Sequence, residues 1–182
     1  MKDIIVSGIQ PTGELHIGNY LGSLKNFVEL QETHDCFFFV ADLHALTGEI
    51  KSADELSKNI RSLIVTFLAA GLDPKKSTIF LQSQVPAHAE LAWIFNTITP
   101  IGELERMIQY KDKAARQSTN INVGLLDYPV LQAADILLYK PTHVPVGQDQ
   151  MQHLELTNTI ARKFNNKFGQ TFTEIKPFMQ KP

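Results

Sequence analysis

Short apolar runs separated by longer amphipathic segments constrain the fold of this chain more than any other feature. The runs at Ile4–Ile9, residues 36–40 and residues 78–82 have the length and apolar content of buried strands. Between them, residues 20–30 and the segment that starts at Ser52 carry apolar side chains at helical spacing. Apolar strands joined by helical crossovers pair in parallel and are covered on both faces. The pattern predicts an α/β fold, a doubly wound parallel sheet with its ligand at the carboxyl ends of the strands.

Turn and capping residues divide the rest of the chain. Ser52 followed by Glu55 is a capping box, and Gly71 ends the apolar stripe that follows it. After Pro86 the strand pattern stops, and residues 87–97 and 101–110 predict consecutive helices followed by a polar loop. We therefore predict a helical insertion over about residues 86–126, between the two halves of the sheet.

The strand pattern resumes further along the chain. Residues 142–146 read as a strand between two helices, at 128–139 and 148–168. Residues 171–182 contain two prolines and carry no packing signal.

The net charge, the cysteine count and the length of the apolar runs limit which functions are possible. A formal net charge of −2 gives no global basic footprint, so any contact with nucleic acid must be local. The single cysteine, Cys36, excludes an internal disulfide, fits a reducing compartment and lies in an apolar strand pattern typical of an inert buried thiol. Neither a signal-peptide pattern nor an apolar run of transmembrane length is present. We expect a cytoplasmic protein without a membrane segment.

The turn at residues 10–19 joins the first strand to the first helix. Such a turn offers backbone N–H groups and a positive helix end to a phosphate, and Gly18 allows a ligand to approach the backbone closely. His16 and Asn19 add short polar side chains. On spacing alone, a plain connecting turn explains the segment as well.

The predicted helix at residues 128–139 is apolar almost all round and should be buried. Tyr128, Gln132 and Asp135 form one polar stripe on it, at i, i+4 and i+7. A buried carboxylate needs a donor, so Asp135 either makes a structural hydrogen bond or binds a ligand donor such as an indole N–H.

Three further positions are candidates for binding. Gly147 lies in a second strand-to-helix turn, where Asp149 either contacts a ribose or caps the next helix. His44 follows the end of the second strand. Lys111 and Lys113 fall in the polar loop, where a solvated charge run is the ordinary explanation.

Together these stretches resemble the class I aminoacyl-tRNA synthetases, in the form of the tryptophanyl family. Residues 7–13, Ser-Gly-Ile-Gln-Pro-Thr-Gly, with His16-Ile17-Gly18-Asn19, are similar to the first signature of that class. Residues 128–139 are similar to its side-chain-recognition helix, and residues 147–150 to its Gly-x-Asp-Gln motif. The resemblance implies a nucleotide-binding domain of the HUP type.

The resemblance also implies roles for individual residues. It assigns the catalytic role to His16, Asn19 and Lys113. It implies that ATP is bound by Gln10, Pro11, Thr12, Gly18, Asn19, Gly147, Gln148 and Asp149. It implies that tryptophan is bound by Asp135, Tyr128, Gln132, Gln150, His44 and Val6. No protein metal site is expected.

The implied reaction joins L-tryptophan to ATP, with Mg²⁺ held through the phosphates, and passes the adenylate to tRNA(Trp). The family's second signature, Lys-Met-Ser-Lys-Ser, and its anticodon-binding domain are not in residues 1–182, so we expect an N-terminal catalytic fragment with impaired catalysis. A tyrosyl-type enzyme and a silent tryptophan- or nucleotide-binding module remain alternatives.

A homodimer interface is expected on the inserted helices. It rests on an apolar set too large for a small insertion to bury alone: Leu91, Trp93, Ile94, Phe95, Ile98 and Ile101.

Overall fold

The computed structural model describes residues 2–13, 24–48, 50, 52–110, 121–145, 147 and 150–178. Its chain divides into two compact units, Met1–Val85 and Pro86–Pro182. The first contains β1 (Ile4–Ile9), α2 (Lys25–Leu30), β2 (Asp35–Val40), α3 (Asp42–Ala45), α4 (Ala53–Ala69), β3 (Ser77–Leu81) and the 3₁₀ turn η2 (Gln82–Gln84). The second contains α5 (Ala87–Asn96), α6 (Ile101–Glu105), α8 (Val123–Leu137), β4 (His143–Pro145), α9 (Met151–Phe168) and β5 (Lys176–Phe178).

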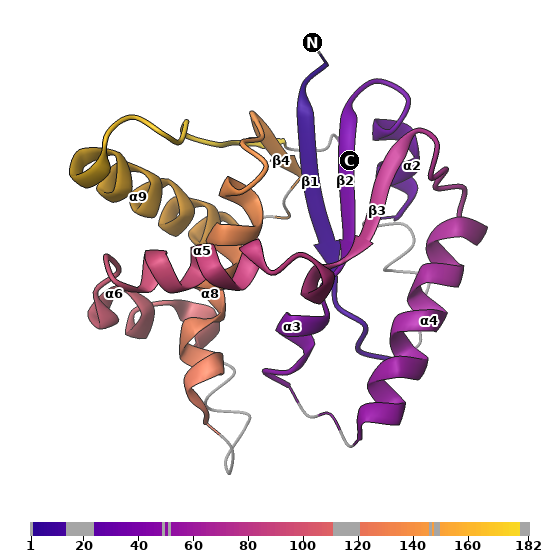
Figure 1. Cartoon of the computed structure of the whole chain (residues 1–182), viewed down its shortest axis with the longest axis horizontal. Helices are drawn as coiled ribbons and strands as arrows, with labels where there is room; N and C mark the ends of the chain where they lie inside the picture. The colour runs from indigo at the N-terminus through magenta and orange to yellow at the C-terminus, as the bar shows by residue number, and fades with distance from the viewer. Residues whose placement is uncertain are drawn as a thin grey trace. The chain divides into compact units, whose positions relative to one another are not determined.

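In the first unit β2 lies between β1 and β3, and both pairings are parallel. The register places Val6 beside Phe37 and Val40 beside Leu81. Figure 1 shows the three strands side by side, with α3 beyond the ends of β1 and β2. Apolar side chains fill the space between sheet and helices. The ring of Phe38 stacks on that of Phe27, with 4.3 Å between the ring centroids. Parallel strands alternating with helices confirm the predicted α/β class.

The capping box at the start of α4 forms as predicted. The Ser52 side chain accepts a hydrogen bond from the backbone N–H of Glu55, and the helix begins at Ala53. Gly71 follows the helix with a φ of +106°, a left-handed conformation that glycine adopts without strain. The helix therefore has the start and the end that the sequence indicates.

A buried amide fastens the segment between α4 and β3. The Gln31 side chain donates to the carbonyl of Gly71 at 2.9 Å and accepts from the N–H of Asp73 at 2.9 Å. The Ser77 hydroxyl donates to the same side-chain oxygen. Because the buried amide is satisfied on both sides, it holds the turn that leads into β3.

The second unit packs helices around an aromatic cluster. Phe95 of α5 is fully buried and makes edge contacts with Phe164 and Phe172. Phe95 therefore belongs to the core, which corrects its place in the predicted interface set. Its neighbour Trp93 lies on the outer side of the same helix and is 72% exposed.

The C-terminal tail has more structure than its sequence predicts. Residues 176–178 form β5, which pairs in parallel with β4, and Phe172 and Ile175 are buried. The expectation of a tail without packing was therefore wrong. Its anchors are side-chain amides of α9, which lie too far along the chain for a local pattern to indicate them.

Several element bounds differ from the predictions. The strand expected at residues 78–82 is displaced by one residue, because Gln82 already belongs to η2. The helix expected at 101–110 stops at Glu105, and α8 begins at Val123, five residues before the predicted start. Asn122 explains that earlier start, since its side chain caps the helix by accepting from the N–H of Leu125.

Candidate functional site

Part of the predicted site lies outside the described residues. This holds for His16, Gly18 and Asn19 in the first signature. It holds equally for Lys113, Gln148 and Asp149. Their roles stay predictions.

The described part of the first signature follows β1 directly. Gln10 and Thr12 are exposed, whereas Pro11 is buried between them. The N–H of Thr12 donates to the carbonyl of Gln10 at 3.0 Å, and Gly13 has a φ of +110°. This tight turn places two polar side chains beyond the carboxyl end of β1, where ligands of open parallel sheets bind. Val6, also predicted to contact the amino acid, is buried within the strand.

The carboxyl ends of β2 and β3 are tied together by polar contacts. Asp42 accepts from the N–H of Ser83 at 3.0 Å, and the Gln82 side chain accepts from the N–H of Leu43 at 3.1 Å. These bonds hold the short helix α3, on which His44 is buried. The sequence pattern does not indicate this role of Gln82, because the residue continues the apolar run that predicts a strand. A polar residue at the end of an apolar strand was the available signal.

The polar stripe on α8 forms as predicted, and each member has a polar partner. The Tyr128 hydroxyl donates to Gln109 at 3.2 Å and lies 3.0 Å from the His153 Nε2. Gln132 donates to Gln150 at 3.5 Å, the outer limit of a hydrogen bond. The structure thus brings together two residues predicted separately for tryptophan binding.

Asp135, the single acid of the stripe, is buried, with 2% of its surface exposed. Its Oδ1 lies 2.6 Å from Nδ1 of His88, and the other ring nitrogen of His88 lies 2.8 Å from the Tyr139 hydroxyl. His88 comes from α5, 47 residues away, so no spacing rule points to it. The only sequence signal was a histidine on an apolar helix and a buried acid in need of a donor.

Two phenols of this region keep their protons at neutral pH. Burial raises the pKa of Tyr128 to about 12. Burial, and secondly the negative charge of Asp135, raise the pKa of Tyr139 to about 12. Both hydroxyls can therefore donate hydrogen bonds at neutral pH.

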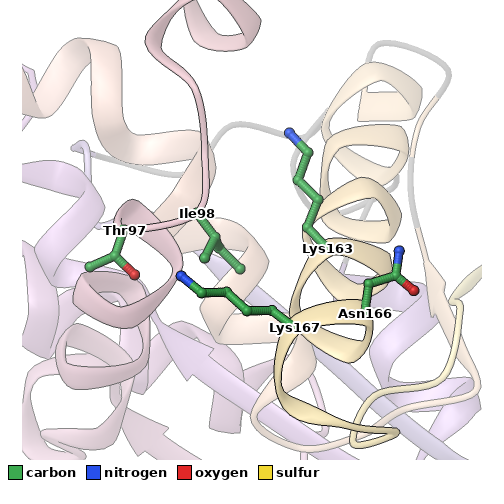
Figure 2. Close-up of a pocket in the computed structure, with 5 residues that line it drawn as sticks. All are labelled: Thr97, Ile98, Lys163, Asn166 and Lys167. Carbon is green, nitrogen blue, oxygen red and sulfur yellow. The ribbon is translucent and has the colours of Figure 1, made fainter.

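A surface pocket of about 400 Å³ in the second unit is lined by none of the residues predicted to bind substrate. It is lined by Thr97, Ile98, Lys163, Asn166 and Lys167. Figure 2 shows Lys167 extending toward Thr97 and Ile98, whereas Asn166 points away from them. Both lysines are engaged, Lys163 with Glu103 at 2.6 Å and Lys167 over the Phe168 ring. The polar groups do not converge, so we assign this pocket no binding role.

In the part of the chain that the structure describes, no three His, Cys, Asp or Glu side chains are grouped as metal ligands. Across the same residues, no helix is both long and apolar enough to span a membrane.

Comparisons with known proteins agree with the fold. The chain matches the family model "tRNA synthetases class I (W and Y)" over residues 2–181. It is 56% identical to a tryptophan–tRNA ligase of Mesorhizobium japonicum over 174 residues, which cover 96% of this chain and 49% of that protein.

Two solved structures have the same fold as this chain. The tryptophanyl-tRNA synthetase from Campylobacter jejuni, complexed with ADP and tryptophan, superposes with a TM-score of 0.90 at 45% identity over 96% of this chain and 54% of its own. The tryptophanyl-tRNA synthetase from Mycoplasma pneumoniae reaches a TM-score of 0.94 at 43% identity over 100% and 54% of the two chains.

The fold is therefore the Rossmann-like α/β fold of class I aminoacyl-tRNA synthetases, as predicted. The chain belongs to the branch of that class that comprises the tryptophan and tyrosine enzymes. It spans about half the length of the curated relatives it matches.

Proposed function

We propose that this chain forms the catalytic domain of a tryptophan–tRNA ligase. In the proposed reaction the carboxylate of L-tryptophan attacks the α-phosphate of ATP, which gives tryptophanyl-adenylate and pyrophosphate. The tryptophanyl group then passes to the terminal ribose of tRNA(Trp). The observation that carries this proposal is the buried Asp135 in the largely apolar helix α8, within a chain whose relatives at 53–56% identity are named for tryptophan.

The proposed amino-acid contacts are those that the family resemblance implies. Asp135 accepts a hydrogen bond from the indole N–H, a group that can only donate. Tyr128, Gln132 and Gln150 supply further polar contacts from the second unit. The family resemblance assigns His44 and Val6 to the same ligand. Asp135 selects the substrate because a buried carboxylate binds a side chain with a hydrogen-bond donor more tightly than one without a donor.

The proposed ATP site uses the two glycine-bearing turns. Gln10, Pro11, Thr12 and Gly18 contact the nucleotide from the first signature, and Gly147, Gln148 and Asp149 contact it from the second turn. His16, Asn19 and Lys113 stabilise charge on the phosphates, and Mg²⁺ enters with ATP as part of the substrate. Positioning and electrostatic stabilisation supply most of the rate enhancement in this mechanism.

Tryptophan-dependent exchange of pyrophosphate into ATP, measured on the full-length protein, tests this function. We expect exchange with tryptophan and little with tyrosine. Exchange with tyrosine alone would indicate the tyrosyl-type alternative. No exchange with either amino acid, in a protein that binds tryptophan, would indicate a silent binding module.

A matched pair of variants on α8 tests the role of Asp135. Asp135→Asn should weaken tryptophan binding by roughly tenfold or more, because a charge-assisted hydrogen bond is lost. Asp127→Asn is the control, since Asp127 lies on the same helix and bonds Asn96 at 2.9 Å. Calorimetric titration with tryptophan measures both, and equal affinities would contradict the proposed role.

We also propose that the helices of the second unit form a homodimer interface. Large apolar side chains remain exposed there: Trp93, Ile94, Ile101, Ile108, Ile121 and Val123. An apolar set of this size on a single chain is typical of an association surface. A cytoplasmic location is proposed in addition, supported by a single, buried cysteine.

A further inference from the structure

His88 contacts two side chains, Asp135 on helix α8 and Tyr139 just after the end of that helix. Its Nδ1 lies 2.6 Å from Asp135, and its Nε2 lies 2.8 Å from the hydroxyl of Tyr139. His88 is fully buried and lies on α5, which packs against α8. The three groups therefore form a chain of hydrogen bonds that runs from the buried Asp135 and His88 to the half-buried Tyr139.

The direction of the hydrogen bond between His88 and Asp135, called the inner bond below, follows from the chemistry of the two groups. An ionised carboxylate can only accept, so Nδ1 carries a proton and donates to Asp135. The Tyr139 hydroxyl can donate to Nε2 of a neutral ring or accept from a protonated one. Asp135 receives a hydrogen bond from His88 in either case, so its anchoring does not depend on the charge of the ring.

We propose that His88 is a positioning residue that orients the Asp135 carboxylate toward the indole N–H and so sets the preference for tryptophan. This inference rests on the proposed function, in which Asp135 contacts the indole. A hydrogen bond at 2.6 Å to the rigid imidazole ring fixes the orientation of the carboxylate. Tyr139 in turn orients the imidazole, since its hydroxyl bonds the second ring nitrogen.

The test compares tryptophan with β-(3-benzothienyl)alanine, an analogue in which sulfur replaces the indole N–H. The two ligands have nearly the same shape, but only tryptophan brings the donor. The ratio of their dissociation constants on the full-length protein therefore reports the Asp135 contact. A variant that only loosens the fold weakens both ligands and leaves this ratio unchanged.

Two amide variants of His88 separate the effect of its hydrogen bond to Asp135 from the effect of its size. In His88→Asn the amide nitrogen takes the place of Nδ1, and in His88→Gln it takes the place of Nε2. The unaltered protein should prefer tryptophan by roughly tenfold or more, the value of one charge-assisted hydrogen bond. We expect His88→Asn to keep most of that preference and His88→Gln to lose it. Tyr139→Phe, which keeps the inner bond, should reduce it only in part.

The outcomes distinguish the inference from the proposed function. If the unaltered protein neither binds nor activates tryptophan, the function is wrong. If it activates tryptophan but shows no preference over the analogue, or if His88→Gln keeps the full preference, the positioning role is wrong and the function stands. If His88→Gln does not fold, the inference is decided by His88→Asn and Tyr139→Phe, and loss of the whole preference in Tyr139→Phe would overturn it.

Discussion

Asn158 of α9 binds the backbone of Ile175 through both ends of its side-chain amide. The amide nitrogen donates to the carbonyl of Ile175 at 2.9 Å, and the amide oxygen accepts from its N–H at 2.8 Å. Two turns further along the helix, Asn165 binds Thr171 and Phe172 in a similar way. These two asparagines bind backbone groups of residues 171–175, which precede β5, and so help to place Phe172 and Ile175 in the core.

The first prediction concerns this anchor. Asn158→Ala should lower the free energy of unfolding by about 1–3 kcal/mol, because two backbone groups of Ile175 lose their partner. Asn166→Ala is the control, since Asn166 is an exposed asparagine of the same helix. Urea unfolding measures both, and amide exchange at Ile175 should accelerate in the first variant alone. Equal midpoints for the two variants would show that the anchor contributes nothing.

Two glycines should respond to alanine with opposite signs. A Cβ at Gly8 would clash with the ring of Phe39, which is buried on the neighbouring strand, so Gly8→Ala should destabilise by about 1–3 kcal/mol. A Cβ at Gly102 of α6 would meet only the end of Arg106, at 3.8 Å. Gly102→Ala should therefore stabilise by about 0.5–1 kcal/mol, the usual gain in a helix.

Thermal unfolding of the two alanine variants beside the unaltered protein checks both signs. An unchanged unfolding temperature for Gly8→Ala would contradict the close packing of β1 against β2.

The proposed dimer interface predicts a specific effect of charge. Trp93→Asp in the full-length protein should shift the dimer to monomer at micromolar concentration, because a carboxylate then has to be buried without a partner. Val65→Asp is the matched control, since Val65 is a similarly exposed apolar residue of α4 in the first unit. Analytical ultracentrifugation reports both states. A protein that is monomeric before any substitution would rule the interface out.

Cys36 should react slowly with thiol reagents in the folded protein. Burial, and secondly the charge of Asp35, raise the pKa of its thiol to about 11, so at pH 8 only about one molecule in a thousand carries the reactive thiolate. Labelling with a chromogenic disulfide reagent should be far slower in buffer than in urea. It is the only cysteine of the chain, so a single rate is measured. Similar rates in the two conditions would contradict the assignment.

The same shift fixes the sign of a pH effect. The folded chain holds the Cys36 proton more tightly than the unfolded chain does, whose thiol has a pKa near 8.5. The contribution to stability is complete below that value and is lost as the pH rises toward about 11. Stability compared between pH 8 and pH 10, in this protein and in Cys36→Ala, isolates the effect.

The sequence by itself determined the features that depend on neighbours along the chain. The strand Ile4–Ile9, the cap at Ser52 and the end of α4 before Gly71 follow from local apolar spacing, capping and backbone freedom. The polar stripe of Tyr128, Gln132 and Asp135 follows from helical periodicity in the same way. Such features can be read locally because residues within a turn of helix, or a few positions of strand, contact one another directly.

Only the tertiary structure decided which distant groups meet. Asp135 needed a donor on sequence grounds, but His88 became that donor because α5 packs on α8. The tail looked unstructured because its partners, Asn158 and Asn165, lie on a helix that precedes it. In each case a buried polar group takes whichever partner the packing brings near, and that choice depends on the whole fold and not on any local pattern.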